Sequence, residues 1–327
     1  MLDSSAHAGV LLESAPCPFG CPSSDQFVVV GRDRLHGLPG EFRIVRCAGC
    51  GLLRTDPRPT PETIGFYYPA DYGPYMETLV PTGGLSRTQP RWRRLVRALY
   101  RKVFRFNVSI VPELEPGRML EVGCASGAYL ASMATQGWQA EGIEFSEDAS
   151  AEARRAGLAV QTGSLETAVA EKSSFDLIVA WMVIEHLHQP VRALRKLHEW
   201  AKPGARFCLS VPDAGALEFR VFGGAWYALH LPNHLYHFTP ATIRRLLEQT
   251  GWSVERVFHQ RTLGNLIGSL GNWLEDRRAP AGIHRALQRF PETSGRMGLV
   301  VLYPLAWLLS LVGQTGRMTV WARKLPQ

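Results

Sequence analysis

Two pairs of cysteines near the start of the chain have the spacing of metal ligands. They are Cys17, Cys21, Cys47 and Cys50. Four thiolates suit a tetrahedral zinc ion. Residues 1–15 lack a positively charged start before an apolar stretch, so a secretory signal and a disulfide framework are disfavoured. Because four protein ligands leave no open position, we expect a structural zinc ion, with four unrelated thiols as the alternative.

A second candidate site is the turn that follows the apolar run Met119–Val122. The run predicts a buried strand, and a helix is expected from about Gly127. Glycines let a ligand approach the backbone, and free N–H groups at a helix start point at it. Glu121, at the strand's end, can meet an ammonium or hydroxyl group. The glycine spacing lacks G-x-G-x-x-G, which disfavours a dinucleotide. The expected contact residues of the turn are Gly123, Cys124, Ala125 and Gly127.

Glu144 is the second carboxylate of interest. It lies near the end of a predicted strand, Gln139–Phe145, and follows Glu121 by 23 residues. At that distance a second-strand carboxylate reaches a ribose diol, because it accepts hydrogen bonds from two adjacent hydroxyls. The alternative is a helix-capping or surface acid.

Histidines supply the candidates for proton transfer, since imidazole titrates near neutral pH. His186 directly follows Glu185 after a predicted strand, and His234 and His237 follow a long segment, 213–228, that we expect to be a loop able to close over substrate. We take His186 and His234 as candidate bases and Glu185 as orienter or second base. Each histidine can equally be structural. A metal at His234 and His237 lacks an obvious third ligand.

The elements that must position these groups alternate between strand and helix from Arg118 onward. This predicts an α/β, doubly wound, mostly parallel sheet, with a helical insertion at 264–316 before the last strand. The predicted strands are 119–122, 139–145, 158–161, 175–179, 206–211, 252–258 and 318–323. Further helices are expected to begin after Ser146 as N-cap, at Pro190 and after Thr239. Ligands bind at the carboxyl ends of such strands. Further candidate residues at those ends are Phe145, Ser164, Leu165 and Ala180.

The rest of the chain divides into two parts before a domain at 115–327. Residues 1–55 predict a small zinc ribbon built on two strand-like stretches. Residues 56–114 form a connector, in which the prolines of 56–61 are expected to prevent regular structure. Three tyrosines in 66–72 either pack between modules or reach over the site.

Composition and charge bound the partners. The apolar fraction of 46% and charged fraction of 20% are typical of a folded protein, and the formal charge is +7. Residues 91–106 predict a basic amphipathic helix, which either packs on the main domain or lies on an anionic membrane or nucleic acid. Residues 297–312 are strongly apolar but short for a membrane span. We expect a cytoplasmic protein, with peripheral membrane contact through both segments as a minority interpretation.

Several motifs together resemble those of the class I S-adenosylmethionine (SAM)-dependent methyltransferases. They are Leu120-Glu-Val-Gly-Cys-Ala-Ser-Gly127, Gly142-Ile-Glu-Phe-Ser146, Phe175-Asp-Leu-Ile178, Glu185-His186-Leu187 and Lys202-Pro-Gly204. The cysteine, proline and tyrosine segments look like one branch of that family, which includes enzymes that modify deoxysugars. Ala125 replaces the middle glycine of the family pattern, and Ser164 stands where the family often has Asp.

The resemblance implies a seven-stranded, Rossmann-like sheet with SAM across the strand ends. Glu121 and the 123–127 loop would hold the methionine part, Glu144 the ribose, and Leu165 would flank adenine. The methyl acceptor would be a small, sugar-like molecule, and a protein base would remove its proton. Two alternatives remain open: an RNA-modifying methyltransferase and an inactive SAM-binding scaffold. Nucleic acid is disfavoured because Ala180-Trp-Met-Val differs from the motif of base-amino methyltransferases. A nicotinamide dehydrogenase is least favoured.

Overall fold

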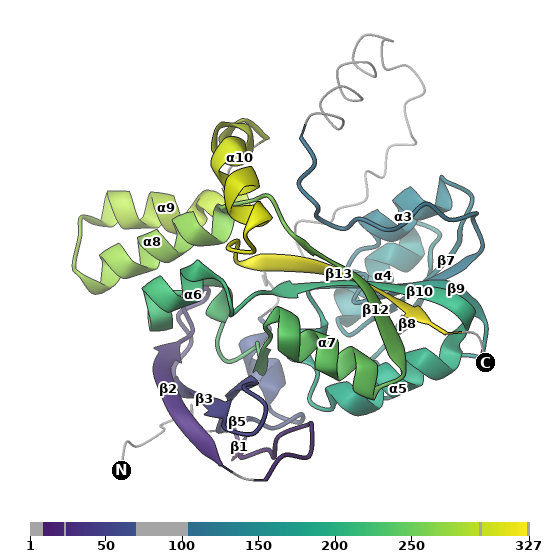
Figure 1. Cartoon of the computed structure of the whole chain (residues 1–327), viewed down its shortest axis with the longest axis horizontal. Coiled ribbons are helices and arrows are strands. Elements are labelled where there is room, and N and C mark those ends of the chain that lie inside the picture. Colours follow the sequence, from purple (N-terminus) through teal and green to yellow (C-terminus); the bar gives the residue numbers. More distant parts are fainter. Residues whose placement is uncertain (1–8, 23, 70–103, 294–295, 326–327) are drawn as a thin grey trace.

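A seven-stranded sheet forms the centre of the molecule (Figure 1). The computed structural model describes residues 9–22, 24–69, 104–293 and 296–325. The strand order is β12-β13-β10-β9-β6-β7-β8, and β13 runs antiparallel to both neighbours while the remaining pairs are parallel. The strands are β6 (Arg118–Val122), β7 (Gln139–Glu144), β8 (Ala159–Thr162), β9 (Phe175–Trp181), β10 (Ala201–Pro212), β12 (Trp252–His259) and β13 (Arg317–Lys324). The predicted doubly wound, mostly parallel sheet is confirmed.

Helices cover the sheet and begin where the sequence predicts. They are α3 (Ala128–Ala134), α4 (Glu147–Arg155), α5 (Pro190–Trp200) and α7 (Pro240–Gln249). The Ser146 side chain accepts the Ala149 N–H at the start of α4, and Thr239 forms a capping box at the start of α7. The central strands β9 and β10 are apolar on both faces, as expected for parallel strands between two helical layers.

The N-terminal residues form a second sheet that is not built from them alone. Its order is β11-β4-β3-β2, with β2 (Asp25–Arg32), β3 (Glu41–Cys47), β4 (Leu53–Thr55) and β11 (Tyr236–His237). Thus β11, from the segment after β10, adds an edge strand to the N-terminal sheet. Cys17, Phe19 and Leu52 belong to the same buried cluster as the large sheet.

The prediction that the proline-rich segment lacks regular structure is wrong. Its residues Arg58–Pro59 form β5, which pairs with β1 (Leu12–Glu13), and η1 (Ile64–Tyr67) follows. Proline is tolerated there because a two-stranded ribbon leaves an edge on which no N–H is required.

The predicted insertion contains three helices, α8 (Gly264–Asp276), α9 (Ala281–Thr293) and α10 (Arg296–Leu311), which Figure 1 places together beyond one end of the sheet. Close packing of α8 requires small residues, since a Cβ on Gly268 would collide with Tyr227. In the described residues no helix is long and apolar enough to cross a membrane. Residues 91–103 of the predicted basic helix lie outside the described part.

The expectation of a long loop at 213–228 is also wrong. This segment forms α6 (Leu217–Phe222), η3 (Gly223–Ala225) and η4 (Tyr227–Leu229). Phe219 and Trp226 are buried in the cluster that joins it to the N-terminal sheet. A segment anchored by two buried aromatic side chains is part of the core rather than a free lid.

Candidate functional site

The turn after β6 is shaped by backbone conformations that few residues adopt. Gly123, Ala125 and Gly127 all have positive φ, at 70°, 46° and 86°. A Cβ on Gly123 would lie 2.6 Å from Val183 Cγ2, and one on Gly127 would collide with Leu158. The two glycines are therefore required by close packing as well as by φ. Ala125 takes the same left-handed region despite its side chain, so the turn keeps its shape without the middle glycine of the family motif.

Glu121 lies beneath this turn and has an unsatisfied acceptor. Its side chain is buried, and Oε2 has no hydrogen-bond partner in the described residues. Burial, together with the nearby Glu144 carboxylate, raises the pKa of Glu121 well above its usual value. A cationic or N–H-bearing ligand group in the turn would supply the missing partner.

Glu144 ties two backbone turns together at the end of β7. One carboxylate oxygen accepts the Ala125 N–H and the other accepts the Ser146 N–H, each at 2.8 Å. Burial raises the pKa of Glu144, and these two hydrogen bonds partly offset that shift. Phe145, beside it, leaves 56% of its side chain exposed. Glu144 thus shapes the 123–127 turn and retains lone pairs for a further donor.

A buried polar cluster follows β9. Glu185 lies in η2 (Ile184–His186) and is fully buried, and both of its carboxylate oxygens lack hydrogen-bond partners among the described residues. Burial raises the pKa of Glu185 to about 8. His186 and His234 lie against it, with ring centroids 4.7 Å apart. One ligand atom from each of Glu185, His186 and His234 falls within 4.8 Å of the other two.

Backbone carbonyl groups set the tautomers of both histidines. His186 Nδ1 lies 3.0 Å from the Asn233 oxygen, and His234 Nδ1 lies 2.9 Å from the Ala228 oxygen. Because a carbonyl can only accept, each Nδ1 carries the hydrogen and each Nε2 keeps its lone pair. Burial and the neighbouring imidazoles lower the pKa of both histidines. Both are therefore neutral at pH 7.

Comparison of the chain with known proteins identifies its family. The family model described as "Methyltransferase domain" matches residues 91–257, about half of the chain. The chain belongs to this methyltransferase family. It is a SAM-dependent methyltransferase.

Individual relatives and solved structures share a smaller part of their sequence with this chain. The ubiquinone biosynthesis O-methyltransferase of Xanthomonas euvesicatoria is 30% identical over 163 residues, which cover 46% of this chain and 68% of the relative. The corresponding protein of Pseudomonas aeruginosa is 28% identical over 130 residues, covering 37% of this chain and 56% of the relative. A SAM-dependent methyltransferase structure from Mesorhizobium loti is 18% identical, with a TM-score of 0.45, over 65% of this chain and 93% of that one.

The site residues of the methyltransferase fit SAM chemically. Glu121 offers a buried acceptor to an ammonium group, since its Oε2 has no partner among the described residues. Leu165 is buried at the end of β8, while Ser164 Oγ caps a turn by accepting the Thr167 N–H at 3.3 Å. Ala180 is fully buried in β9, and Cys124 is buried in the turn itself.

Sequence reasoning missed two members of the histidine cluster and did not single out a third. Asn233 orients His186 and donates its amide to the Tyr67 carbonyl at 2.8 Å. His230 adopts a left-handed φ of 42° and places Nδ1 3.3 Å from His234 Nε2. Tyr68 was only one of three tyrosines considered, and its hydroxyl lies 2.9 Å from His186 Nδ1. The four-residue spacing of His230 and His234 was the available signal.

His237 belongs elsewhere, although the sequence pairs it with His234. Its Nε2 lies 3.3 Å from the Thr55 hydroxyl, so it joins β11 to the N-terminal sheet. The further ligands that a metal at His234 seemed to lack come instead from Glu185 and His186 of η2.

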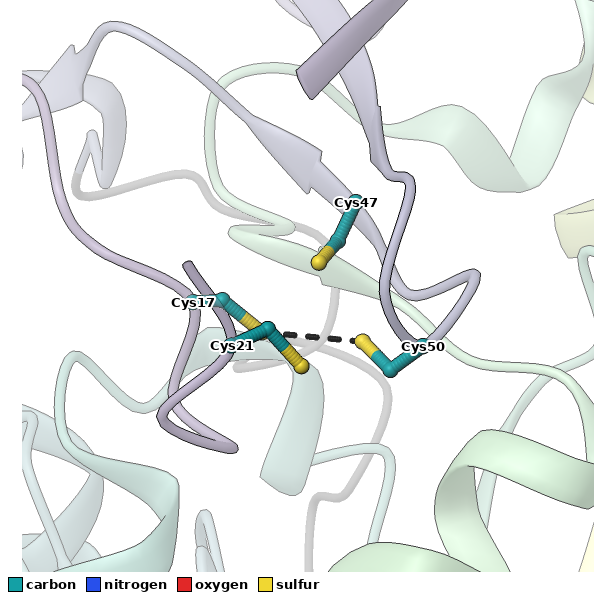
Figure 2. A group of neighbouring side chains, drawn as sticks. All are labelled: Cys17, Cys21, Cys47 and Cys50. Atoms are coloured by element: carbon teal, nitrogen blue, oxygen red, sulfur yellow. Dashed lines mark hydrogen bonds between the residues drawn. The ribbon is translucent and has the colours of Figure 1, made fainter. Parts of the chain in front are cut away.

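The four cysteines of the methyltransferase converge although the two pairs lie far apart in the sequence (Figure 2). Their Sγ atoms all lie within 4.8 Å of one another, and those of Cys17 and Cys50 are 3.6 Å apart. Gly49 keeps this site compact, since a Cβ there would be 3.3 Å from Cys21 Sγ. Arg245 of α7 approaches the same sulfur at 3.9 Å. Four free thiols in this arrangement fit a tetrahedral zinc ion.

Proposed function

We propose that this methyltransferase moves a methyl group from SAM to a hydroxyl of a small, sugar-like molecule, with His186 or His234 as general base. The observation that carries the proposal is the buried cluster of Glu185, His186 and His234 beside the turn that would hold the cofactor. Both imidazoles are neutral and keep an Nε2 lone pair for the proton, although burial lowers their pKa.

The cofactor-facing residues divide the work by chemistry. We assign the methionine ammonium to Glu121 and the 123–127 turn, the ribose hydroxyls to Glu144, and one face of adenine to Leu165, with Phe145 beside it. The support is that Glu121 lacks a partner and Glu144 lies at the end of the neighbouring strand. SAM supplies a methyl group on a positively charged sulfur.

The chain's own contribution is alignment and proton removal. The acceptor hydroxyl must lie in line with the methyl group, and its proton passes to the Nε2 lone pair of His186 or His234. The products are the methyl ether, the demethylated cofactor and one proton. Tyr68 and Asn233 hold the His186 ring in place. Glu185 stabilises the imidazolium that forms, as a neighbouring carboxylate would.

A sugar-like acceptor is favoured by the polar groups that gather around His186. This cluster contains imidazole, phenol and carboxyl groups rather than apolar side chains alone. The hydroxyl groups of a sugar need such donors and acceptors. The relatives named O-methyltransferases support oxygen as the methylated atom. RNA modification and an inactive scaffold are the competing functions.

Incubation of the purified protein with methyl-deuterated SAM and separate acceptor panels tests the function. The panels are nucleotide sugars, phenols and total RNA, and mass spectrometry locates the label. We expect the label on a nucleotide sugar. Labelled RNA would favour the RNA alternative, and SAM binding without transfer to any panel would favour the scaffold.

We propose a structural zinc ion at the four cysteines. The support is the convergence of four sulfur atoms in a closed group. Metal analysis of reduced protein should find about one zinc per chain bound there, and strong chelation should lower the melting temperature. Reduced, folded protein without zinc would contradict this assignment.

We also propose a peripheral membrane contact through 297–312 together with 91–106. Helix α10 carries no charge between Arg296 and Arg317, and it exposes large apolar side chains to solvent. They are Val301, Leu305, Leu308 and Leu311. Cosedimentation with anionic vesicles tests the contact. Leu308→Glu should reduce binding, whereas Ile283→Glu on α9, equally exposed, should not. Absence of vesicle binding by the wild type at low salt would contradict the contact.

A further inference from the structure

The Glu185 carboxylate is the least explained group in the methyltransferase site. It is fully buried, and neither oxygen has a hydrogen-bond partner among the described residues. If Glu185 served only to orient a histidine, an imidazole N–H would donate to it. Instead both neighbouring histidines direct Nδ1 to backbone carbonyls of Asn233 and Ala228. Arg317 lies near enough to lower the pKa of Glu185, but it donates no hydrogen bond to either oxygen, so both oxygens remain open to a ligand.

The two histidines are held as metal-ligating histidines usually are. In such sites one ring nitrogen donates to a carbonyl or carboxylate, and the other binds the ion. Here the carbonyls of Asn233 and Ala228 hold the Nδ1 atoms of His186 and His234. Asn233 is in turn fixed by the Tyr67 carbonyl at 2.8 Å. The outer contact to His186 is therefore itself supported.

The distances match a single ion after a small contraction. The candidate ligand atoms of Glu185, His186 and His234 lie within 4.8 Å of one another. Ligands about 2.0–2.2 Å from one ion are about 3–4 Å apart. The His234 Nε2 also faces His230 Nδ1 at 3.3 Å, a long contact between two nitrogens that ion binding would replace.

We propose that Glu185, His186 and His234 bind one divalent transition-metal cation, and that the acceptor oxygen completes its coordination. Two imidazoles and one carboxylate leave open positions, as catalytic sites do, and suit Mn²⁺ or Fe²⁺. This inference rests on the proposed methyl transfer to oxygen. In the cation-loaded form His186 and His234 act as ligands in place of the general base of the proposed function. The bound hydroxyl then releases its proton to water, because the cation stabilises the alkoxide.

The new site differs in chemistry from the four-cysteine site. Thiolates select zinc, whereas nitrogen and oxygen ligands accept manganese. Mn²⁺ is therefore the probe, added to protein that retains its zinc. Electron paramagnetic resonance of free Mn²⁺ reports binding, and the melting temperature reports stabilisation of the folded state.

We expect one Mn²⁺ per chain in addition to zinc, and a melting temperature that rises with Mn²⁺. Glu185→Gln should weaken binding at least tenfold. The same variant should stay folded without Mn²⁺, because a neutral amide replaces a buried carboxyl group whose oxygens have no hydrogen-bond partners. His234→Gln is the second variant, and it too should lose Mn²⁺ binding.

Glu218→Gln is the matched control. Glu218, in α6, is also a buried glutamate, but its oxygens already accept hydrogen bonds from Trp226 and Gly316. Its Mn²⁺ affinity should equal that of wild type. Lack of Mn²⁺ binding in wild type, or undiminished binding in Glu185→Gln and His234→Gln, would overturn the cation site. Methyl transfer that persists in EDTA without Mn²⁺ binding would overturn it while leaving the proposed function intact. Mn²⁺ binding without methyl transfer to any acceptor would support the cation site and contradict the proposed function.

Discussion

Most strands of the central sheet begin at one edge, the amino edge, and end at the other, the carboxyl edge. The acidic residues at these two edges have opposite pKa shifts. At the amino edge, Asp176 accepts hydrogen bonds from Lys202 and from the Arg118 N–H, and these contacts lower its pKa. At the carboxyl edge, burial raises the pKa of every buried acid named here, and several have unpartnered oxygens. They are Glu121, Glu144, Glu185, Asp213 and Glu218.

Under the proposed function, the difference separates a structural edge from a ligand-binding one. Paired acids at the surface cost little and contribute little. Buried acids without cations destabilise the empty protein, so their persistence at one edge points to ligands that complete them. A surface hollow lined by Pro116, Gly117 and Lys202 also lies at the amino edge, but its charges are already compensated. Concavity alone therefore does not mark the site.

The largest effect is expected from the histidines of the carboxyl edge. His234→Asn and His186→Asn should each lower kcat about 100-fold, because the proton acceptor or ligand is lost. Isothermal titration should show unchanged affinity for SAM. His284→Asn on α9, which contacts Gln288, serves as the control and should retain activity. Full activity in both site variants would show that neither histidine takes part in methyl transfer.

Asp213 should reveal the cost of burial at this edge. Its pKa is raised to about 7 by burial, and its usual value is about 4, so the folded protein holds a proton that the unfolded chain releases in this window. The free energy of unfolding therefore falls as pH rises from about 4 to about 7. Asp213→Asn should remove this loss. Its advantage over wild type in the free energy of unfolding should therefore grow by about 2 kcal/mol from pH 5 to pH 8. Chemical denaturation at both pH values measures it; parallel pH profiles would show that Asp213 is charged when folded.

Glu144 should matter for cofactor affinity. Glu144→Ala removes the acceptor for the Ala125 and Ser146 N–H groups and for a ribose hydroxyl. We expect SAM binding to weaken at least tenfold, about 1.4 kcal/mol. Glu144→Gln keeps one acceptor oxygen and should weaken binding less. Unchanged affinity in Glu144→Ala would mean that the ribose partner is another residue.

The smallest effect is expected at the amino edge, with the opposite sign. The folded pKa of Asp176 is lowered, so its stabilisation is present at neutral pH and is lost as pH falls through that pKa. Asp176→Asn should destabilise slightly at pH 7 and less at pH 3. The Asp176 side chain is 36% exposed, which limits the effect by solvent screening. An effect equal to that of Asp213 would remove the contrast between the edges.

The features that the sequence predicted correctly are local in the chain. The strands, the caps at Ser146 and Thr239, and the glycine turn after β6 depend on residues a few positions apart. Periodicity and capping follow from backbone geometry, so they can be recognised without knowing the fold. The cysteine convergence was predicted for the same reason, since ligand spacing within each pair is local.

Contacts between distant segments decided the rest. Tyr68 meets His186 across 118 positions, and β11 joins a sheet whose other strands precede it by far. The sequence paired His234 with His237, but tertiary packing turns His237 toward Thr55 and His234 toward Glu185. Which polar groups end up buried without partners depends on everything packed around them. Residue types and spacing therefore determined the chemistry available to this protein, and only the folded arrangement determined which groups meet.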